Sequence, residues 1–382
     1  MRRLLLLVAL AGCGWGAKSA SEPATTVQAA AAERAPRVRF AEMTKSPWPA
    51  DEATTREAKL ATACGERDAA LEQVARALLT SPVAARDADS AVAYLRANGE
   101  PHLRPRVLIA TGRAPMRDDV LRAQLESAKS ERSRCAVAIA PMANGEEVVI
   151  TIVVDALADL APLPTRARTG EWLALEAVIH PPAEGAKVVI LGPRGLPRTV
   201  PAALDGGRVR ARFALDQPGA FTVQLVADLA QGPQPVLEAR VFADVEPTIE
   251  EAAAPGEEAA EPNDIEALYR MFAAARVNLP AITRDPQLEA AARAHAERMR
   301  DRKRTAHDLG EGDLRTRLAA ANIEASAIAE NVAHARTLAL AHRALYASPS
   351  HRLNMLGNHT RVGLGLAVAP DQSVYVCEVF AR

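Results

Sequence analysis

The chain carries Ala329-Glu330-Asn331, then Ser348-Pro349-Ser350-His351-Arg352-Leu353-Asn354-Met355-Leu356, and then the alternating run from Arg361 to Val368. Polar residues of these types, placed between an Ala-rich segment and a strand, indicate a site and not merely a core. Six of the eight histidines also follow residue 290, at positions His295, His307, His334, His342, His351 and His359. If this protein uses imidazole chemistry, we expect it in the last quarter of the chain.

The histidines of this segment differ in their surroundings. Apolar residues at helical spacing around His295 predict a helix that begins near Asp285-Pro286, with proline at a tolerated first-turn position. A lone histidine on such a stripe is usually a core residue, and we interpret His295 in that way. His307 follows a charged run and precedes a helix-ending loop, where a side chain can face a cleft. Pro349 breaks the next helix, so we expect His351 at a corner. Solvent-exposed positions are expected for His334 and His342.

Three polar residues of this region have side chains that suit a common site. His307, His351 and Glu330 are ordinary zinc ligands, and three ligands would leave an open position for water. The same residues are equally suited to a hydrogen-bonded cluster in which Glu330 fixes the histidine tautomers. Spacing alone leaves both interpretations open, because the His-Glu-x-x-His pattern of zinc proteases is absent. The sequence also has no Gly-x-Ser-x-Gly elbow, no Gly-rich phosphate loop and no cysteine placed as a nucleophile, so covalent catalysis has little support.

A family resemblance joins these motifs. The matching elements are, in order, Arg284-Asp285-Pro286-Gln287-Leu288, His295-Ala296-Glu297-Arg298-Met299, His307, Ala329-Glu330-Asn331, Ser348 to Leu356, and Val362-Gly363-Leu364-Gly365-Leu366. Together and in register they make residues 268–382 resemble a bacterial SCP/CAP domain, of the superfamily of cysteine-rich secretory and plant pathogenesis-related proteins. The resemblance implies an α-β-α sandwich with a central antiparallel sheet, and a cleft where His307, Glu330 and His351 converge. We assign this domain to residues 265–382.

The sequence also departs from the family pattern. Ala329 and Ser350 stand where the family usually has glycine, Leu345 stands where it has tryptophan, and Asp308 replaces a small hydroxyl residue. Leu345 therefore indicates repacking beside the cleft. Asp308 adds a carboxylate that would alter cation binding.

The first residues predict a lipid anchor. A short basic region and an apolar run precede Leu10-Ala11-Gly12-Cys13, and the run is too short to span a bilayer. This sequence resembles a bacterial lipobox, which implies a signal peptide over residues 1–13 and lipidation of Cys13; an ordinary secretory signal is the alternative. We therefore expect an extracytoplasmic protein of the cell envelope, held on a membrane through Cys13. Gly14 is not the aspartate of inner-membrane retention, which favours the outer membrane.

Composition divides the rest of the chain. Residues 14–50 are expected to form a disordered tether, and residues 246–264, rich in glutamate and proline, a solvated acidic linker. Between them we predict an N-terminal α+β domain over residues 51–158. Short apolar runs with turn residues every 8 to 12 positions predict an immunoglobulin-like β-sandwich over residues 160–245. Its alternating arginines, Arg208, Arg210 and Arg212, are expected on one solvated strand face.

A short internal sequence similarity links the first and last domains. Residues 67–77 match residues 284–294 in their Arg-Asp, Leu-Glu, Ala-Arg and final Ala positions, and each segment is expected to open a helix. In both domains two apolar strands follow, which predicts that the first domain is a degenerate CAP-like copy. Coincidence in an Ala- and Arg-rich sequence is the alternative. The first domain has His102 alone and none of the cleft motifs, so a copy would have no site.

The cysteines and the overall charge limit the possible redox state and the possible partners. Outside the cytoplasm a disulfide can form, and we pair Cys64 with Cys135; Cys377 lies in an apolar strand and is expected to be a buried free thiol. A net charge of -1 and 3% aromatic residues give no support for nucleic-acid binding.

Three functions remain open on the sequence. A surface protein that binds a lipid, a protein or a divalent cation such as zinc is favoured over an enzyme, because no nucleophile is identifiable. The alternative is a metal- or Glu330-assisted hydrolase that uses His307 and His351. In a third interpretation the CAP domain is structural and the other domains are functional.

Overall fold

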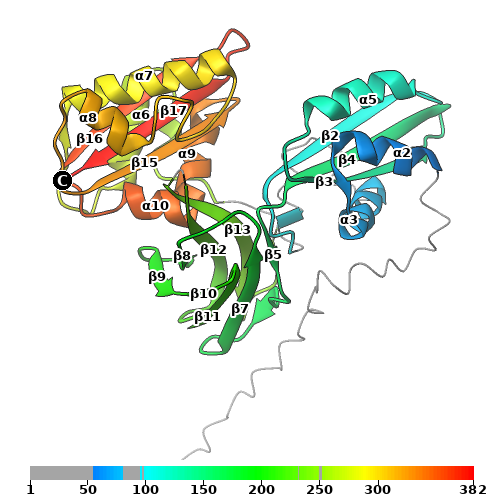
Figure 1. Ribbon diagram of the computed structural model, residues 1–382, viewed down its shortest axis with the longest axis horizontal. Helices are drawn as coiled ribbons and strands as arrows, with labels where there is room; N and C mark the ends of the chain where they lie inside the picture. Colours follow the sequence, from blue (N-terminus) through cyan, green and yellow to red (C-terminus); the bar gives the residue numbers. More distant parts are fainter. Residues whose placement is uncertain (1–54, 81–94, 97–98, 231, 249–251) are drawn as a thin grey trace, which may run out of the picture. The chain divides into compact units, whose positions relative to one another are not determined.

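A computed structural model describes residues 55–80, 95–96, 99–230, 232–248 and 252–382 (Figure 1). The signal peptide (1–13), with Cys13, and the tether (14–50) lie outside the described residues. Within the described part the chain is an α+β structure with four β-sheets. None of the helices described is both long and apolar enough to cross a membrane.

The N-terminal residues form one sheet between helices. The helices are α2 (Thr55–Cys64), α3 (Ala69–Thr80) and α5 (Asp118–Ser127). The strands are β1 (Glu66–Arg67), β2 (Leu103–Arg113), β3 (Ser133–Pro141) and β4 (Glu146–Asp155), in the order β1-β3-β4-β2. Alternate residues of β3 and β4 enter two separate cores, since side chains on a strand point to opposite faces. One core contains residues of α3, and the other contains residues of α2 and α5.

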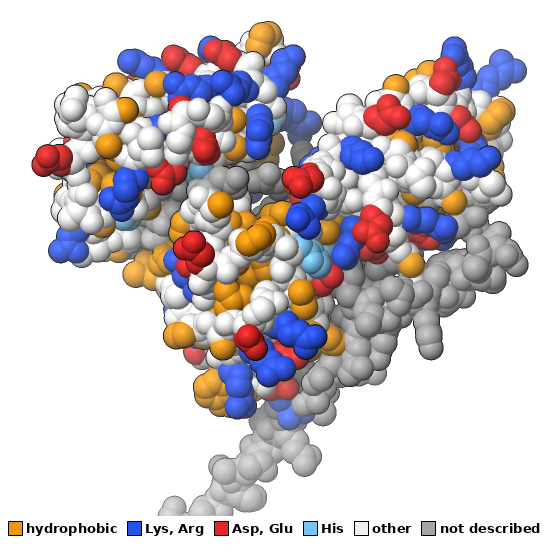
Figure 2. Space-filling view, in the orientation of Figure 1, with side chains coloured by type: hydrophobic (Ala, Val, Ile, Leu, Met, Phe, Trp, Pro, Cys, Tyr) orange, Lys and Arg blue, Asp and Glu red, His pale blue; other side chains and the backbone are white. Residues whose placement is uncertain are grey.

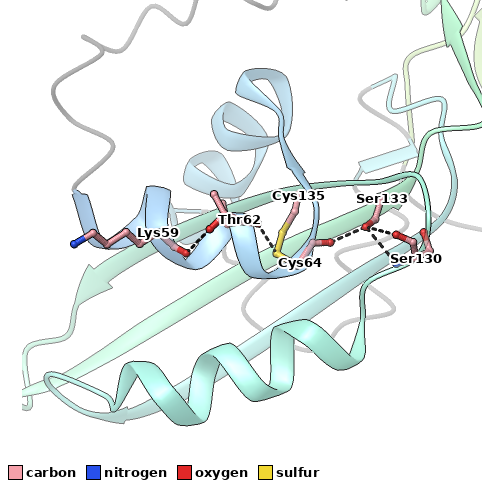
Figure 3. Close-up of a disulfide and its surroundings, with 7 residues drawn as sticks. Lys59, Thr62, Cys64, Ser130, Ser133 and Cys135 are labelled. Carbon is pink, nitrogen blue, oxygen red and sulfur yellow. Dashed lines mark hydrogen bonds between the residues drawn. A yellow bond between two sulfur atoms is a disulfide. The ribbon is translucent and has the colours of Figure 1, made fainter.

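A disulfide joins α2 to the sheet. Cys64, the last residue of α2, is bonded to Cys135 of β3, with their Cα atoms 5.7 Å apart (Figure 3). These are the two cysteines that the sequence analysis paired. The Ser133 hydroxyl donates to the carbonyl of Cys64 at 2.7 Å, so a hydrogen bond holds the same junction. Cys377 is a free, buried thiol.

The middle of the chain forms two sheets around one core, as in a β-sandwich. One sheet has the order β10-β11-β7-β5 and the other β6-β13-β12-β8-β9. Their strands are β5 (Ala158–Leu160), β6 (Arg166–Ala167), β7 (Trp172–Ile179), β8 (Gly185–Leu191), β9 (Arg198–Pro201), β10 (Ala203–Asp205), β11 (Arg208–Ala214), β12 (Gly219–Leu229) and β13 (Gly232–Ala243). Burial alternates strictly along β7 and through most of β11, and Arg208, Arg210 and Arg212 are exposed as expected. The immunoglobulin-like topology itself stays a prediction.

The C-terminal residues form a three-layer α-β-α domain. Its sheet has the order β14-β16-β17-β15. The elements are α6 (Ile265–Ala275), β14 (Thr283–Arg284), α7 (Pro286–Arg302), α8 (Leu314–Ala320), β15 (Ile328–Ala335), α9 (Leu338–Ala347), α10 (Pro349–Met355), β16 (Arg361–Val368) and β17 (Val374–Ala381). Residues of α6, α9 and α10 pack in the core on one face of this sheet, and residues of α7 and α8 in the core on the other (Figure 1).

Two strand glycines let α7 approach the sheet closely. A Cβ atom added at Gly363 would lie 2.1 Å from the backbone of Leu288, and one added at Gly365 would lie 2.2 Å from the backbone of Ala292. Real Cβ atoms essentially never come so close, so the helix occupies the space that side chains would need. The Gly-x-Gly spacing of β16 therefore fixes how the helix packs.

The predicted acidic linker is in part wrong. A short 3-10 helix, η1 (Glu257–Ala259), lies within it, and Glu257 forms an ion pair with Arg343 of α9. The carbonyl of Pro255 is 3.0 Å from Nε2 of His342, and Ala254 is buried. Because of these contacts, residues 254–257 pack on the C-terminal domain and are not part of a solvated spacer. His342, expected at the surface, is fully buried as a result.

The first and last sheets share their topology and several side-chain contacts. In each, a two-residue first strand pairs in parallel with the third strand and leads into a helix. Asp68 and Asp285 each accept a hydrogen bond from a backbone N–H in the first turn of that helix. The residue before each aspartate is an arginine that pairs with a glutamate five positions on, as Arg67–Glu72 and Arg284–Glu289.

Candidate functional site

A loop and an edge strand bring two of the three predicted site residues together. His307 lies in the loop after α7, and Glu330 lies within β15, not at the end of the Ala-rich segment as expected from the sequence. Nδ1 of His307 is 2.8 Å from Oε2 of Glu330. The His307 side chain is 28% exposed and that of Glu330 only 3%, so the imidazole is the part of this pair that solvent reaches.

A third residue, Arg317, completes the group. It comes from α8, which Asp313 caps by accepting from the backbone N–H of Thr316 at 2.8 Å. Nη2 of Arg317 donates to Oε1 of Glu330 at 2.7 Å and to Oε2 at 2.9 Å, and also to the carbonyl of His307 at 3.2 Å. We call His307, Arg317 and Glu330 the cleft triad, after the cleft that the family resemblance implies.

The electrostatics of the triad favour an ionised carboxylate. Burial by itself would raise the pKa of Glu330, but the hydrogen bond from His307 and the charge of Arg317 outweigh it and hold that pKa below its usual value. Burial and the neighbouring Glu330 raise the pKa of the Cys377 thiol well above its usual value. The thiol therefore stays protonated, and its Sγ donates to Oε1 of Glu330 at 3.3 Å.

His351 follows the helix break that the sequence predicts at Pro349. It lies inside α10, a new helix that starts after the break at Ser348. Its backbone carbonyl accepts from Nδ2 of Asn331 at 3.0 Å. Asn331 follows Glu330 directly on β15, so the two side chains point to opposite faces of the sheet. The Asn331 side chain is thus on the side of α10, whereas the triad is on the side of α7 and α8.

A second polar group lies on the α10 side. Nδ2 of Asn331 also donates to Oε2 of Glu378 at 2.8 Å, and Nδ2 of Asn354 donates to Oδ1 of Asn331 at 3.0 Å. Glu378 is fully buried, and burial raises its pKa to about 7 despite the bond from Asn331. This group ties α10 to the sheet.

The remaining predicted residues have structural contacts. His295 is buried, with Nδ1 at 2.9 Å from Glu311 and Nε2 at 2.9 Å from the carbonyl of Ala306, in agreement with a core histidine. Asp308 accepts from the backbone N–H groups of Gly310 and Gly312 and so shapes the loop that carries His307. Among the residues that the structure describes, no three His, Cys, Asp or Glu side chains are grouped so that they could hold a metal ion.

Sequence reasoning missed Arg317 and Glu378. Each has a weak signal: Arg317 lies one helical turn after the capping Asp313, and Glu378 is the only charged residue in the apolar run 374–381. The chemistry of the site follows from the triad. Glu330 accepts from Nδ1–H of His307, which leaves Nε2 as an acceptor on the exposed side of the ring.

Comparison with known families identifies the domain that carries this site. Residues 267–379 match the profile of the cysteine-rich secretory protein (CAP) family, over less than a third of the 382 residues. The C-terminal domain is a CAP domain. A search among curated proteins found no match.

Several solved structures are similar to parts of the chain. An outer surface protein from Borrelia burgdorferi is 21% identical, with a TM-score of 0.30 over 32% of this chain and 93% of its own. An extracellular protein containing an SCP domain from Bacillus anthracis is 15% identical, with a TM-score of 0.29 over 59% and 86%. A cysteine-rich secretory protein from Staphylococcus aureus is 17% identical, with a TM-score of 0.26 over 66% and 85%.

Proposed function

We propose that this chain is an extracytoplasmic binding lipoprotein, anchored to a membrane of the cell envelope through Cys13, with its CAP domain as the binding module. The carrying observation is the cleft triad, which presents one partly exposed imidazole, 28% exposed, backed by a buried carboxylate whose charge Arg317 balances. Because the hydrogen bonds of Glu330 are satisfied within the protein, the site can bind a ligand through His307 without reacting with it. Lipid or protein ligands fit the proposal.

The mixed charge of the surface does not favour nucleic acid as a partner. On the face shown in Figure 2, Lys and Arg side chains are interspersed with Asp and Glu, without a continuous basic surface. The net charge of -1 agrees with this distribution.

Hydrolysis is the second candidate, because Glu330 orients His307. A carboxylate that accepts from Nδ1–H leaves Nε2 free to take a proton from water, as a general base does. No nucleophilic side chain contacts this nitrogen in any described hydrogen bond, so the step would depend on water alone.

The two candidates are separated by an activity assay on the chain without its anchor, from Gly14 to Arg382. Fluorescently labelled casein is incubated with the wild type, with Glu330→Gln and with His307→Ala; Glu297→Gln, at an exposed position of α7, is the matched control. We expect no casein cleavage by any of them. Cleavage that both site variants lose and the control keeps would overturn the binding function in favour of hydrolysis.

The lipid anchor is tested in cells that express the full precursor. Wild type should carry a radiolabelled acyl chain and sediment with membranes, and Cys13→Ser should lose both properties. A Cys13→Ser protein that remains in the membrane fraction would contradict the proposed anchor. Separation of inner and outer membranes then tests the outer-membrane location.

We also propose that the first domain is a degenerate CAP-like copy. Ile152 pairs with both Val107 and Ala136, just as Val379 pairs with both Glu330 and Gly363. Val107, an apolar residue, thus stands at the position of Glu330, which supports a copy without a site. A crystal structure of the mature chain in which the two sheets differ in strand order would contradict this origin.

A further inference from the structure

The carboxylate of Glu330 has no room in its coordination for a further cation. Oε1 contacts Nη2 of Arg317 at 2.7 Å and Sγ of Cys377 at 3.3 Å, and Oε2 contacts Nη2 of Arg317 at 2.9 Å and Nδ1 of His307 at 2.8 Å. An ionised carboxylate offers about four lone-pair positions, so two partners on each oxygen use its capacity. A metal ion would have to displace a donor that is already in place.

The donor that a metal would displace first is held firmly. Arg317 is 9% exposed, and its third contact, to the carbonyl of His307, joins α8 to the loop after α7. Displacing the guanidinium would leave it buried beside a divalent cation, without the carboxylate that balances its charge. An arginine guanidinium does not lose its proton to relieve such repulsion.

The other side chains needed for a metal site are not gathered around Glu330. The described residues contain no group of three His, Cys, Asp or Glu side chains that could hold a metal ion. The residues present therefore do not fit the divalent cation that the sequence analysis considered.

We propose that Arg317 is the resident cation of the CAP cleft, and that it takes over the electrostatic part that a bound divalent metal would play beside Glu330. It keeps the carboxylate ionised, and the carboxylate in turn fixes the proton of His307 on Nδ1. Arg317 is thus a positioning residue for His307. This inference deepens the proposed binding function, since it concerns what the same site accepts.

The inference defines the chemical class of the ligand group that meets His307. Because Glu330 accepts from Nδ1–H, the neutral form of the ring presents Nε2 as a hydrogen-bond acceptor, and the side chain is 28% exposed. The site therefore selects a ligand that donates a hydrogen bond, such as a hydroxyl or amide N–H group, and does not require a metal bridge.

The first experiment is a zinc titration by calorimetry on the chain without its anchor, from Gly14 to Arg382. We expect no saturable one-to-one binding in the wild type and no change in its melting temperature when zinc or a chelator is added. One zinc per chain that Glu330→Gln abolishes, while the exposed control Glu297→Gln retains it, would overturn the resident-cation assignment.

A mutant cycle tests the positioning role without depending on a ligand. Arg317→Met should lower the melting temperature more than the double variant Arg317→Met with Glu330→Gln, because only the single variant leaves a buried carboxylate without its counter-ion. Arg317→Lys should recover part of the loss, since it restores the charge but not the guanidinium geometry. If Arg317→Met does not fold, the melting temperature of the double variant is compared with those of Glu330→Gln and Arg317→Lys instead.

One outcome of the cycle and one of the titration are decisive. Equal melting temperatures for Arg317→Met and the double variant would overturn the inference, because Arg317 would then not neutralise Glu330. Zinc binding by the wild type would overturn it while leaving an extracytoplasmic binding role intact. Cleavage of casein would instead remove the binding function and leave the resident cation standing.

Discussion

Glu330 and Asn331 are neighbours in the sequence but serve opposite faces of one sheet. Glu330 joins Arg317 and His307 on the side of α7 and α8, and Asn331 joins Glu378 on the side of α10. Because strand side chains alternate, a motif that looks like one functional unit in the sequence supplies two separate polar groups. One of them reaches solvent through His307, and the other is buried and holds a helix in place.

Glu378 makes the stability of the CAP domain depend on pH. Its folded pKa of about 7 lies above the ordinary value of 4.5, so the folded state holds the proton more tightly than the unfolded state. The stability that this proton contributes is fully present below about pH 4.5 and is lost as the pH rises through 7. A shift of this size corresponds to about 3 kcal/mol.

We therefore expect Glu378→Gln to become more stable relative to the wild type, by about 2–3 kcal/mol, between pH 5 and pH 8. Urea unfolding of the CAP domain, followed at both pH values, measures the difference. Glu297→Gln is the control, because this exposed residue should leave the pH dependence unchanged. Parallel stability curves for Glu378→Gln and wild type would contradict the assignment.

Sequence patterns reveal site residues only where a polar side chain contrasts with its surroundings. His307 could be predicted because it follows a charged run and precedes a helix-ending loop, and Glu330 because it stands beside an Ala-rich segment. Arg317 has only the weak signal of the capping Asp313 one turn before it, which does not single it out among 46 Lys and Arg residues. Glu378 could not be placed because β17 is buried along its whole length, which removes the alternation that would separate its faces.

At the scale of elements, the packing of α7 on β16 depends on Gly363 and Gly365, which have no Cβ atom. Gly363→Ala would place a Cβ atom 2.1 Å from the backbone of Leu288, where no flexible side chain can move aside. We expect a loss of about 3 kcal/mol or more, because the helix must shift away from the sheet and from the core that it shares with β17.

Gly112→Ala is the matched control for this prediction. Gly112 is also a strand glycine, in β2, but an added Cβ atom would meet only the side chain of Met116 at an ordinary 3.4 Å. Thermal unfolding of both variants measures the contrast. Equal melting temperatures would show that α7 can move without cost and would contradict the close packing.

The elements were predictable to different degrees for physical reasons. Strands β7 and β11 follow from their alternation, and α7 follows from its apolar stripe and its Asp-Pro start. Strand β15 could not be predicted, because its alanines favour a helix and only the pairing with β17 makes it a strand. The packing of η1 on α9 was hidden because the pairing of Glu257 with Arg343 joins residues 86 positions apart.

At the scale of the whole molecule, the described residues form separate cores, and the disulfide lies in only one of them. The two cores of the N-terminal residues, the single core of the sandwich and the two cores of the CAP domain share no residues. The Cys64–Cys135 disulfide closes a loop of 71 residues within the N-terminal part. Its contribution to stability should therefore stay within that part.

Removing the disulfide by Cys64→Ala with Cys135→Ala should destabilise the N-terminal domain by about 4 kcal/mol, since the unfolded chain regains the entropy of a loop of this length. In calorimetry of the mature chain we expect one transition to move to lower temperature while the CAP transition stays in place. A shift of the whole profile would mean that the domains unfold together. Cys377→Ala is the control: it alters the contact with Glu330 and should move only the CAP transition.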